Sequence, residues 1–266
     1  MSKKLSVLNF LSVILVIIVN YLAQAGRFNN NTIASLSGEY DNLFTPAGFA
    51  FSIWGIIFIS LLFYTGFQLY KAFSSYFDSG YILKTGYWFI ISNLANALWV
   101  IVWLYEYTFI SVIVMFVILG SLLKIVLNTN MERWNAPLKI IAFAWWPICL
   151  YAGWIAVASI ANIAAYLSKI GWDGWIFSES QWTVIMILIA VIVNSLMIYK
   201  RNMREFALVG AWALIAIYVR HEGGNQFIAY TAIGGAILLL AYISYHGFVN
   251  RRTNPFHKLL NSKANI

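Results

Sequence analysis

Residues 138–166 read LKIIAFAWWPICLYAGWIAVASIANIAAY, and this stretch decides the fold class. After Lys139 it contains no Asp, Glu, Lys, Arg or His. A helix needs about 20 apolar residues to cross the roughly 30 Å hydrocarbon core of a bilayer. The stretch is therefore predicted to be a membrane-spanning helix, with its surplus length extending beyond the hydrocarbon.

Seven further apolar runs predict an all-α polytopic membrane protein with about eight transmembrane helices. The eight candidate spans cover residues 5–24, 47–70, 86–105, 108–127, 138–166, 182–199, 206–220 and 227–248. The seventh is the shortest, because Arg204 and Glu205 precede it and Tyr218 must lie near one interface.

The composition of the 266 residues supports this fold class. Apolar and aromatic residues make up 62% of the chain and charged residues 10%, against about 45–50% and about 25% in soluble domains. Such a surface excludes a soluble enzyme, a nucleic-acid-binding module and a disordered chain. Aromatic residues reach 18%; interfacial belts can hold some of these rings, and others can line a pocket for a flat apolar ligand.

The first span has two interpretations. Lys3 and Lys4 precede an apolar stretch that ends in Ala23-Gln24-Ala25, which also fits a signal peptide cleaved before Gly26. However, the apolar stretch is longer than the roughly 7–15 residues of a usual signal core. We therefore expect residues 1–25 to be retained as a helix.

The distribution of basic residues predicts a multi-pass protein of the cell membrane with both termini in the cytoplasm. The outer side then keeps Arg27, Lys169 and Arg220, together with six of the nine acidic residues. The net charge of +8 needs no nucleic-acid partner, and the basic tail (249–266) is expected to contact anionic headgroups of the lipid bilayer. The inner side holds 14 of the 17 basic residues: Lys3, Lys4, Lys71, Lys84, Lys124, Arg133, Lys139, Lys200, Arg201, Arg204, Arg251, Arg252, Lys258 and Lys263.

The middle of the spans lacks ionisable residues, which argues against several functions. Ion-coupled pumps, voltage sensors and carriers of charged substrates keep charged residues at membrane depth, and a retinal protein would need a lysine within 227–248, which has none. His221, His246 and His257 are scattered, and Cys149 is the single cysteine. We therefore predict no metal site, no catalytic residue and no required cofactor.

Three segments carry polar or aromatic side chains inside these apolar helices. In the first, Thr45-Pro46 is typical of a helix start, because Thr can cap free amides and Pro needs no donor there. Phe51 and Trp54 follow three residues apart and share a helix face. This face either lines a pocket or packs in the membrane beside small residues.

The second segment carries Asn93, Asn96, Trp99 and Trp103 at helical spacing. An amide in hydrocarbon seeks a partner on a neighbouring helix. The two asparagines therefore act either as interhelical contacts or as amides presented to a ligand between stacked indoles.

The third segment carries Tyr151, Trp154, Ala158 and Asn162 on one helical stripe. Pro147 precedes it and removes a backbone hydrogen bond near residue 143. Such a stripe is more often a packing seam than part of a site, but its polar groups argue against a purely structural role.

In this order, the three segments resemble the TspO/MBR family of tryptophan-rich sensory proteins, the relatives of the mitochondrial translocator protein once called the peripheral benzodiazepine receptor. The proline-rich start of that family's second helix leads to a Trp and is similar to Pro46 through Trp54. Its third helix carries Asn-x-x-Trp, as in residues 96–99, and its fifth carries Tyr-x-x-Trp-x-x-x-Ala-x-x-x-Asn, as in residues 151–162. The sequence departs from the pattern in several places. Ala47 or Thr45 stands for one of two prolines at the start of the second helix, and Phe49 stands for a Trp. Phe51 and Trp54 lie three residues apart where four are expected, and Leu150 stands for a proline of the fifth helix.

The resemblance covers residues 1–166 and implies a TspO-like five-helix ligand-binding bundle there. The chain is then an extended member, with three additional transmembrane helices over 167–248 before the basic tail. These helices are expected either to pack against the first five or to form a separate surface. Family members often form homodimers, so the resemblance also implies a homodimer.

The resemblance further implies a pocket that opens toward the loop between the first two helices and binds tetrapyrroles, sterols or synthetic aromatic ligands. The residue chemistry agrees, because indole walls with a few amides suit a flat hydrophobic molecule. With the loop at 25–46 outside, the mouth is expected to face outward. The family's pocket positions correspond to Phe51, Trp54, Asn96, Trp99, Trp103, Tyr151, Trp154, Ala158 and Asn162.

We therefore expect a receptor or sensor for a hydrophobic small-molecule ligand such as a porphyrin-like tetrapyrrole or a sterol-like molecule. The alternative is a permease for an uncharged or amphipathic small solute, although the sequence has no convincing internal repeat of the kind many carriers show. Light-dependent breakdown of a bound porphyrin is a third interpretation. It would be a side activity of the pigment, because the spans supply no acid–base pair or nucleophile.

Overall fold

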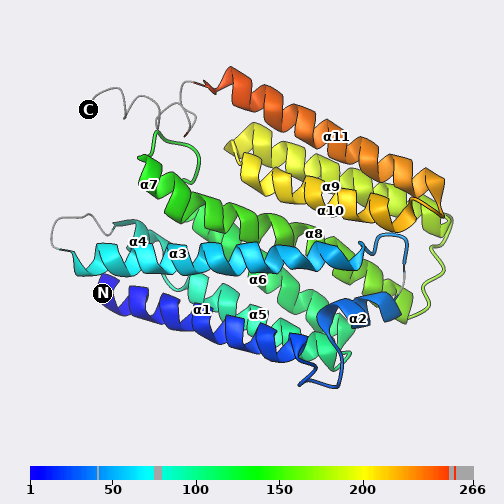
Figure 1. Cartoon of the computed structure of the whole chain (residues 1–266), viewed down its shortest axis with the longest axis horizontal. Helices are drawn as coiled ribbons and strands as arrows, with labels where there is room; N and C mark the ends of the chain where they lie inside the picture. Colours follow the sequence, from blue (N-terminus) through cyan, green and yellow to red (C-terminus); the bar gives the residue numbers. More distant parts are fainter. Residues whose placement is uncertain (41, 75–79, 252–254, 256–266) are drawn as a thin grey trace.

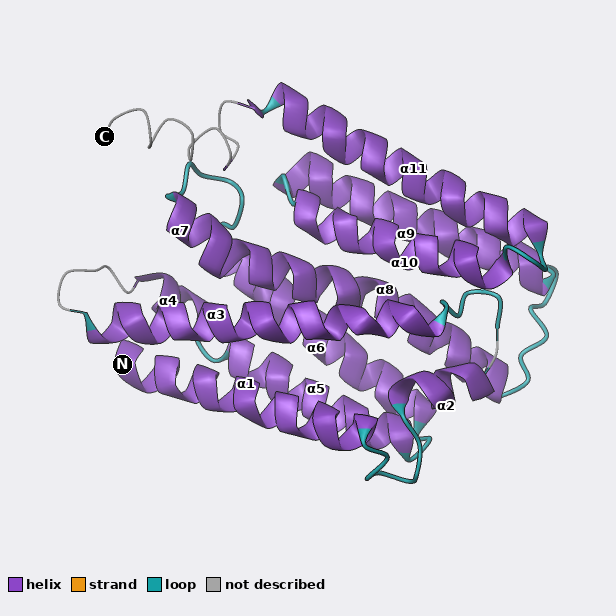
Figure 2. Ribbon diagram, in the orientation of Figure 1, coloured by secondary structure: helices purple, strands orange, loops and turns teal. Residues whose placement is uncertain are grey.

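The computed structural model describes residues 1–40, 42–74, 80–251 and 255, and this part of the chain consists of helices and loops (Figure 1, Figure 2). Most of the predicted basic tail, including Arg252, Lys258 and Lys263, lies outside the described residues. A 3₁₀ segment, Gly48–Ser52, precedes α3, and a π-helical segment, Ile141–Trp145, joins α7 to α8. The α-helices are α1 (Ser2–Gln24), α2 (Ile33–Glu39), α3 (Ile53–Phe73), α4 (Gly80–Thr85), α5 (Trp88–Leu104), α6 (Thr108–Asn128), α7 (Leu138–Ile140), α8 (Trp146–Lys169), α9 (Glu179–Arg201), α10 (Arg204–His221) and α11 (Gln226–Val249).

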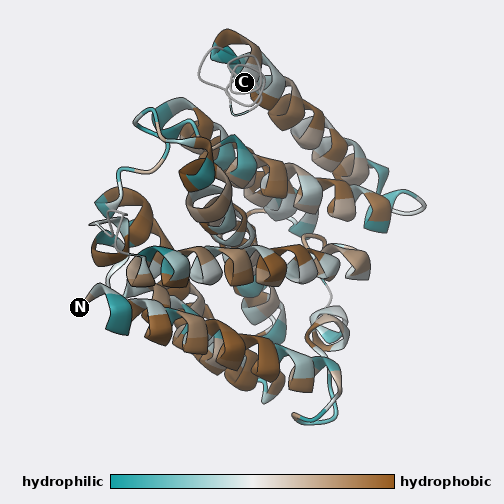
Figure 3. Ribbon diagram, turned by 60° about the vertical axis from the view of Figure 1, so that its left-hand side comes forward, coloured by the Kyte–Doolittle hydropathy of each residue, from teal (hydrophilic) through white to brown (hydrophobic). Residues whose placement is uncertain are grey.

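Each of the eight predicted spans corresponds to a long helix. Within the described residues, six helical stretches are long and apolar enough to cross a membrane, and α5 is a shorter apolar helix. The remaining helix, α10, is largely buried and contacts α8, α9 and α11, which shield it from lipid. Hydrophobic colour dominates the long helices in Figure 3, and hydrophilic colour gathers mainly at their ends and in loops. The chain is therefore a polytopic helical membrane protein, as predicted.

The first five long helices close into a ring. α1 contacts α3 and α5, α5 contacts α6, and α8 completes the ring between α6 and α3. The last three helices form a second group beside the ring, in which α10 packs against α8 (Figure 1). Gly153 allows this close approach, because a Cβ atom there would lie 2.6 Å from the carbonyl oxygen of Phe206.

Buried amides join α1 to its neighbours in the ring. Asn9 Nδ2 donates a hydrogen bond to Gln68 Oε1 of α3 at 2.6 Å, and Asn93 Nδ2 of α5 donates to Ser12 Oγ at 2.9 Å. For Asn93, the interpretation as an interhelical contact is thus confirmed. α1 is therefore packed within the bundle, while retention of residues 1–25 in the mature protein stays a prediction.

Thr45-Pro46 does not start an α-helix, contrary to the prediction. A Thr45 cap would have satisfied the backbone amide of Ala47, but this amide donates instead to the carbonyl oxygen of Ala216 in α10 at 3.0 Å. The 3₁₀ segment begins only at Gly48 without a side-chain cap. The linking segment (42–47) is therefore held against α10 before the chain enters α3.

Pro147 alters the helix near residue 143, as predicted. Because proline has no N–H, the carbonyl of residue 143 loses its α-helical partner. The backbone adopts the π-helical segment directly before Trp146. Such single π turns within α-helices are frequent beside functional sites.

Candidate functional site

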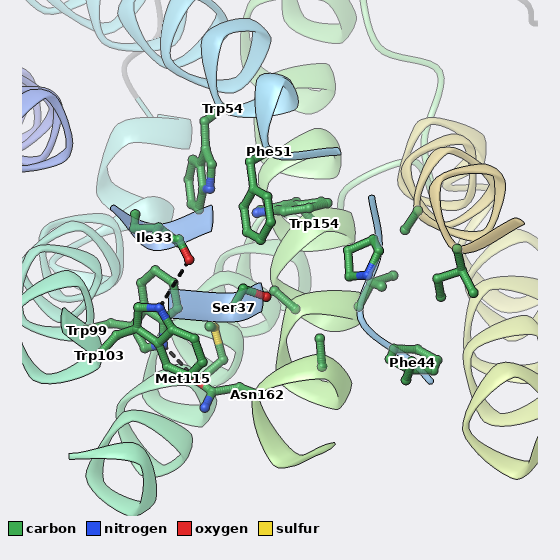
Figure 4. Close-up of a pocket in the computed structure, with 16 residues that line it drawn as sticks. Ile33, Ser37, Phe44, Phe51, Trp54, Trp99, Trp103, Met115, Trp154 and Asn162 are labelled. Atoms are coloured by element: carbon green, nitrogen blue, oxygen red, sulfur yellow. Dashed lines mark hydrogen bonds between the residues drawn. The ribbon is translucent and has the colours of Figure 1, made fainter. Parts of the chain in front are cut away.

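The aromatic stripes of α3, α5 and α8 meet at one cavity of about 50 Å³, which α2 covers (Figure 4). Seven of the nine predicted site residues line it: Phe51, Trp54, Trp99, Trp103, Trp154, Ala158 and Asn162. None of its described lining residues is charged. The other residues of its wall are Ile33, Ser37, Phe44, Pro46, Met115, Val157, Ala161, Ala213 and Ile217.

The aromatic rings form two groups around the cavity. Figure 4 shows Phe51, Trp54 and Trp154 together, with Trp99 and Trp103 across from them. The edge-to-face pairs Phe51–Trp154 and Trp54–Trp154 have ring centroids 5.9 Å and 6.4 Å apart, whereas Trp99 and Trp103 are stacked at 5.9 Å. Both arrangements are favourable for aromatic rings, so the wall is a packed set of π surfaces.

A buried hydrogen-bond chain fixes one of these indoles. Trp99 Nε1 donates to Asn162 Oδ1 at 2.8 Å, and Asn162 Nδ2 donates to Ser111 Oγ of α6 at 2.8 Å. Asn162 therefore orients Trp99 from α8 and ties both residues to α6. The half-buried Ser37 adds a hydroxyl from α2.

Asn96 and Tyr151 do not line the cavity. Asn96 Nδ2 donates to Tyr151 Oη at 3.0 Å, and its Oδ1 accepts from Asn20 Nδ2 of α1 at 3.2 Å. The Tyr151 ring lies edge-on to Trp54, with centroids 5.9 Å apart. The two residues form a buried polar pair that contacts Trp54 but does not line the cavity. This arrangement fits the interpretation of Asn96 as an interhelical contact.

Sequence reasoning missed the walls supplied by α2, by the linking segment and by α10. Thr32 and Ser35 form a capping box at the start of α2, a signal that could have predicted this helix. Ala213 and Ile217 of α10 carry no such signal, because small and aliphatic residues are ordinary in any apolar helix. α10 also holds the 3₁₀ segment, since Trp212 Nε1 donates to the carbonyl oxygen of Ala50 at 3.2 Å.

A polar cluster holds α2 over the cavity. The Tyr40 hydroxyl, at the end of α2, donates to the carboxylate of Glu106 in the α5–α6 turn. Lys169 Nζ lies 3.6 Å from Glu106 Oε2 and 5.2 Å from the centre of the Tyr40 ring. Partial burial and the Glu106 carboxylate both raise the pKa of the Tyr40 hydroxyl, because they disfavour the phenolate. Trp103 Nε1 adds a 3.4 Å hydrogen bond to the carbonyl oxygen of Ile33.

The described side chains that could hold a metal ion gather away from this cavity. Glu132, Cys149 and Glu205 bring their ligand atoms within 4.8 Å of one another. They come from a loop, from α8 and from α10, so sequence spacing does not reveal the group. No ligand of this kind lines the aromatic cavity in the described part of the chain.

The fold and cavity together define a polytopic helical membrane protein with an aromatic cavity enclosed between its helices. The chain matches the model of the TSPO-like protein family over residues 6–245 and belongs to that family. No curated protein and no solved structure matches it. The matched range continues through α9 and α10 into α11, beyond the residues 1–166 that carry the motifs, so it includes the α10 wall of the cavity.

Proposed function

We propose that this protein is an integral membrane receptor or sensor that binds a flat hydrophobic ligand, a porphyrin-like tetrapyrrole or a sterol-like molecule, in the aromatic cavity. The observation that carries the proposal is the convergence of four indoles and Phe51, from three distant parts of the chain, on one uncharged cavity. Aromatic faces suit flat apolar rings, and a few polar groups such as Ser37 and Asn162 suffice to orient a ligand.

The size of the cavity indicates that the ligand enters by displacing part of the wall. Its volume of about 50 Å³ is well below the roughly 300–1,000 Å³ of typical ligand pockets. α2 is the part of the wall best placed to move, because it is a short helix held at its end by the Tyr40–Glu106–Lys169 cluster. Movement of such a cover on binding is common in proteins that enclose their ligands.

Tryptophan fluorescence of the purified protein tests the proposal during titration with a porphyrin. We expect saturable quenching that is lost when Trp99→Ala and Trp154→Ala are combined. The matched control combines Trp172→Ala and Trp175→Ala, which removes two indoles from the α8–α9 loop outside the cavity. Saturable quenching that survives in the first double variant would refute the site.

The same preparation distinguishes the alternatives. Flux of labelled ligand into proteoliposomes would indicate a permease for small solutes, whereas binding without flux supports the receptor. We infer no catalytic role, because the described cavity lining offers no acid–base pair. A porphyrin complex that gives no more photoproduct than free porphyrin under illumination would agree with this inference.

We further propose a multi-pass protein of the cell membrane, with cytoplasmic termini and the α2 side outside. It can form a homodimer, and it can bind a tetrapyrrole but requires no cofactor. The single cysteine, Cys149, is fully buried, so introduced cysteines can be labelled selectively. A membrane-impermeant maleimide should label Gly38→Cys on intact cells and should label Lys124→Cys only after lysis. The reverse pattern would contradict the proposed orientation.

A further inference from the structure

A second cavity, of about 350 Å³, lies at the end of the bundle where α4 and α7 are found (Figure 1). α3, α4, the α6–α7 loop and the π-helical segment enclose it. It shares no described lining residue with the aromatic cavity. We call it the donor-lined cavity, after its polar groups: Tyr64, Lys71, Tyr81, Lys84, Thr85 and Thr129.

The Tyr81 hydroxyl is a polar group of the donor-lined cavity that needs an acceptor. Tyr64 Oη and Thr85 Oγ1 lie 3.0 Å apart, and Thr85 Oγ1 also donates to the carbonyl oxygen of Tyr81. The Tyr81 hydroxyl is buried without a hydrogen-bond partner among the described residues. Burial and the neighbouring Tyr64 raise the pKa of Tyr81, so its hydroxyl stays protonated and remains a donor. A buried donor without a partner is available to hydrogen-bond a bound acceptor.

The charges around the cavity have one sign. Lys71 and Lys84 contribute ammonium groups, and none of the described lining residues is acidic. Lys71 is half-buried, with its Nζ 5.5 Å from the centre of the Phe67 ring, and Lys84 is exposed. A lining of ammonium and hydroxyl donors is complementary to an anionic oxygen group such as a phosphate.

The remaining wall is apolar. Trp134 and Trp145 pack edge-to-face with ring centroids 5.4 Å apart, beside Pro137 and Ile140. A ligand that is complementary to both the donor groups and the apolar wall of this cavity has an anionic head group and an apolar body. The cavity also lies at the lysine-rich end of the bundle, which the positive-inside rule assigns to the cytoplasmic leaflet.

We propose that the donor-lined cavity binds the phosphate of an anionic phospholipid of the inner leaflet. The Tyr81 hydroxyl and the ammonium groups of Lys71 and Lys84 contact the phosphate, and the tryptophan pair lies beside the acyl chains. Basic pockets between transmembrane helices on the cytoplasmic side hold lipid headgroups in this way. A soluble phosphate compound offers the same head, but it leaves the apolar wall uncovered.

Native mass spectrometry of the full chain in an uncharged detergent tests the proposal, with phosphatidylglycerol and phosphatidylcholine as probes. We expect one phosphatidylglycerol per chain, bound at least about tenfold more tightly than phosphatidylcholine. Lys71→Gln combined with Lys84→Gln should abolish this preference, whereas the corresponding arginine variants should keep it. Tyr81→Phe should weaken phosphatidylglycerol binding by about tenfold or more, the loss of one hydrogen bond to a charged group.

The control combines Lys124→Gln and Lys200→Gln, which remove two exposed charges near the same end but outside the cavity. A preference that persists in the Lys71/Lys84 variant, or that falls equally in the control, would overturn the site. Displacement of the lipid by glycerol 3-phosphate at equal concentration would overturn the lipid assignment. If the double variant fails to elute as a monodisperse species, Tyr81→Phe decides alone, because a loss of affinity supports the site and unchanged affinity refutes it.

Discussion

At the residue scale, hydrogen bonding decides which predicted side chains face the aromatic cavity. Polar groups within the hydrocarbon must find partners inside the protein. Asn96 and Tyr151 bond to each other, so neither presents its polar group to the cavity. Trp99 satisfies its N–H through Asn162 and leaves its ring on the cavity wall.

Tyr151→Phe tests this distinction. The change removes the acceptor for Asn96 and should lower the free energy of unfolding by about 1 kcal/mol, while porphyrin affinity changes less than about twofold. Trp154→Ala should instead weaken porphyrin binding at least about tenfold, because it removes a ring from the wall. Chemical unfolding and fluorescence titration measure the two effects. A tenfold loss of affinity in Tyr151→Phe would place Tyr151 in the binding site.

The sequence predicts the residues of this wall only in part. Helical spacing assigns Trp99 and Trp103 to the same face and does so correctly. Asn96 lies at the edge of that stripe, and spacing alone does not say whether the edge faces the cavity or the neighbouring helix. In the structure, Asn96 accepts a hydrogen bond from Asn20 of α1, so this edge of the stripe faces the neighbouring helix.

At the element scale, the eight long helices follow from apolar length, whereas α2 does not. Its seven residues are too short for an amphipathic pattern, and only its capping box marks it in the sequence. Its position over the cavity depends on a contact between Tyr40 and Glu106, which lie 66 residues apart. Such long-range polar contacts cannot be read from one sequence.

Tyr40→Phe should release α2 and raise the association rate constant of a porphyrin several-fold. The pKa of Tyr40 is raised, so its hydrogen bond is fully present below the ordinary tyrosine pKa of about 10. It is lost only when the pH rises through the raised pKa. Titration of Tyr40 should therefore leave the association rate constant of the unmodified protein unchanged between about pH 7 and 9.

Stopped-flow fluorescence measures this rate constant, and Tyr105→Phe is the control. Tyr105 lies in the same turn as Glu106 and is half exposed. Equal rate constants for Tyr40→Phe and the unmodified protein would show that displacement of α2 does not limit ligand entry.

At the scale of the whole molecule, α10, one of the last three helices, completes the aromatic cavity formed by the first five long helices. Ala213 and Ile217 belong to the wall, and the linking segment bonds to α10 through Ala47. The sequence motifs end at residue 162 and gave no sign of this contribution. The decisive feature is the close contact between α8 and α10 at Gly153, which only the folded chain reveals.

Gly153→Ala should separate α8 from α10, because the new Cβ would meet backbone atoms of Phe206 that cannot rotate away. We expect a loss of about 1–3 kcal/mol in stability, as for other overpacked sites, together with weaker porphyrin binding as the α10 wall shifts. The control is Gly120→Ala in α6, where a Cβ meets nothing within 4 Å and the substitution should stabilise the helix by roughly 0.5–1 kcal/mol. Thermal unfolding in detergent compares the two, and equal effects would contradict the role of Gly153.

The π-helical segment Ile141–Trp145 contains one residue more than a regular α-helix would need there. A π turn closes its hydrogen bond over five residues instead of four, so removal of one residue from the segment restores a regular α-helix. Because the wider turn accommodates the extra residue, the residues on both sides of the deletion keep their faces, so Trp154 stays on the aromatic cavity and Ile140 on the donor-lined cavity. Ala144 and Trp145, which line the donor-lined cavity, belong to the segment itself, so the deletion alters the wall that they supply. Relatives that are one residue shorter here should therefore keep the aromatic cavity unchanged and differ in the wall of the donor-lined cavity.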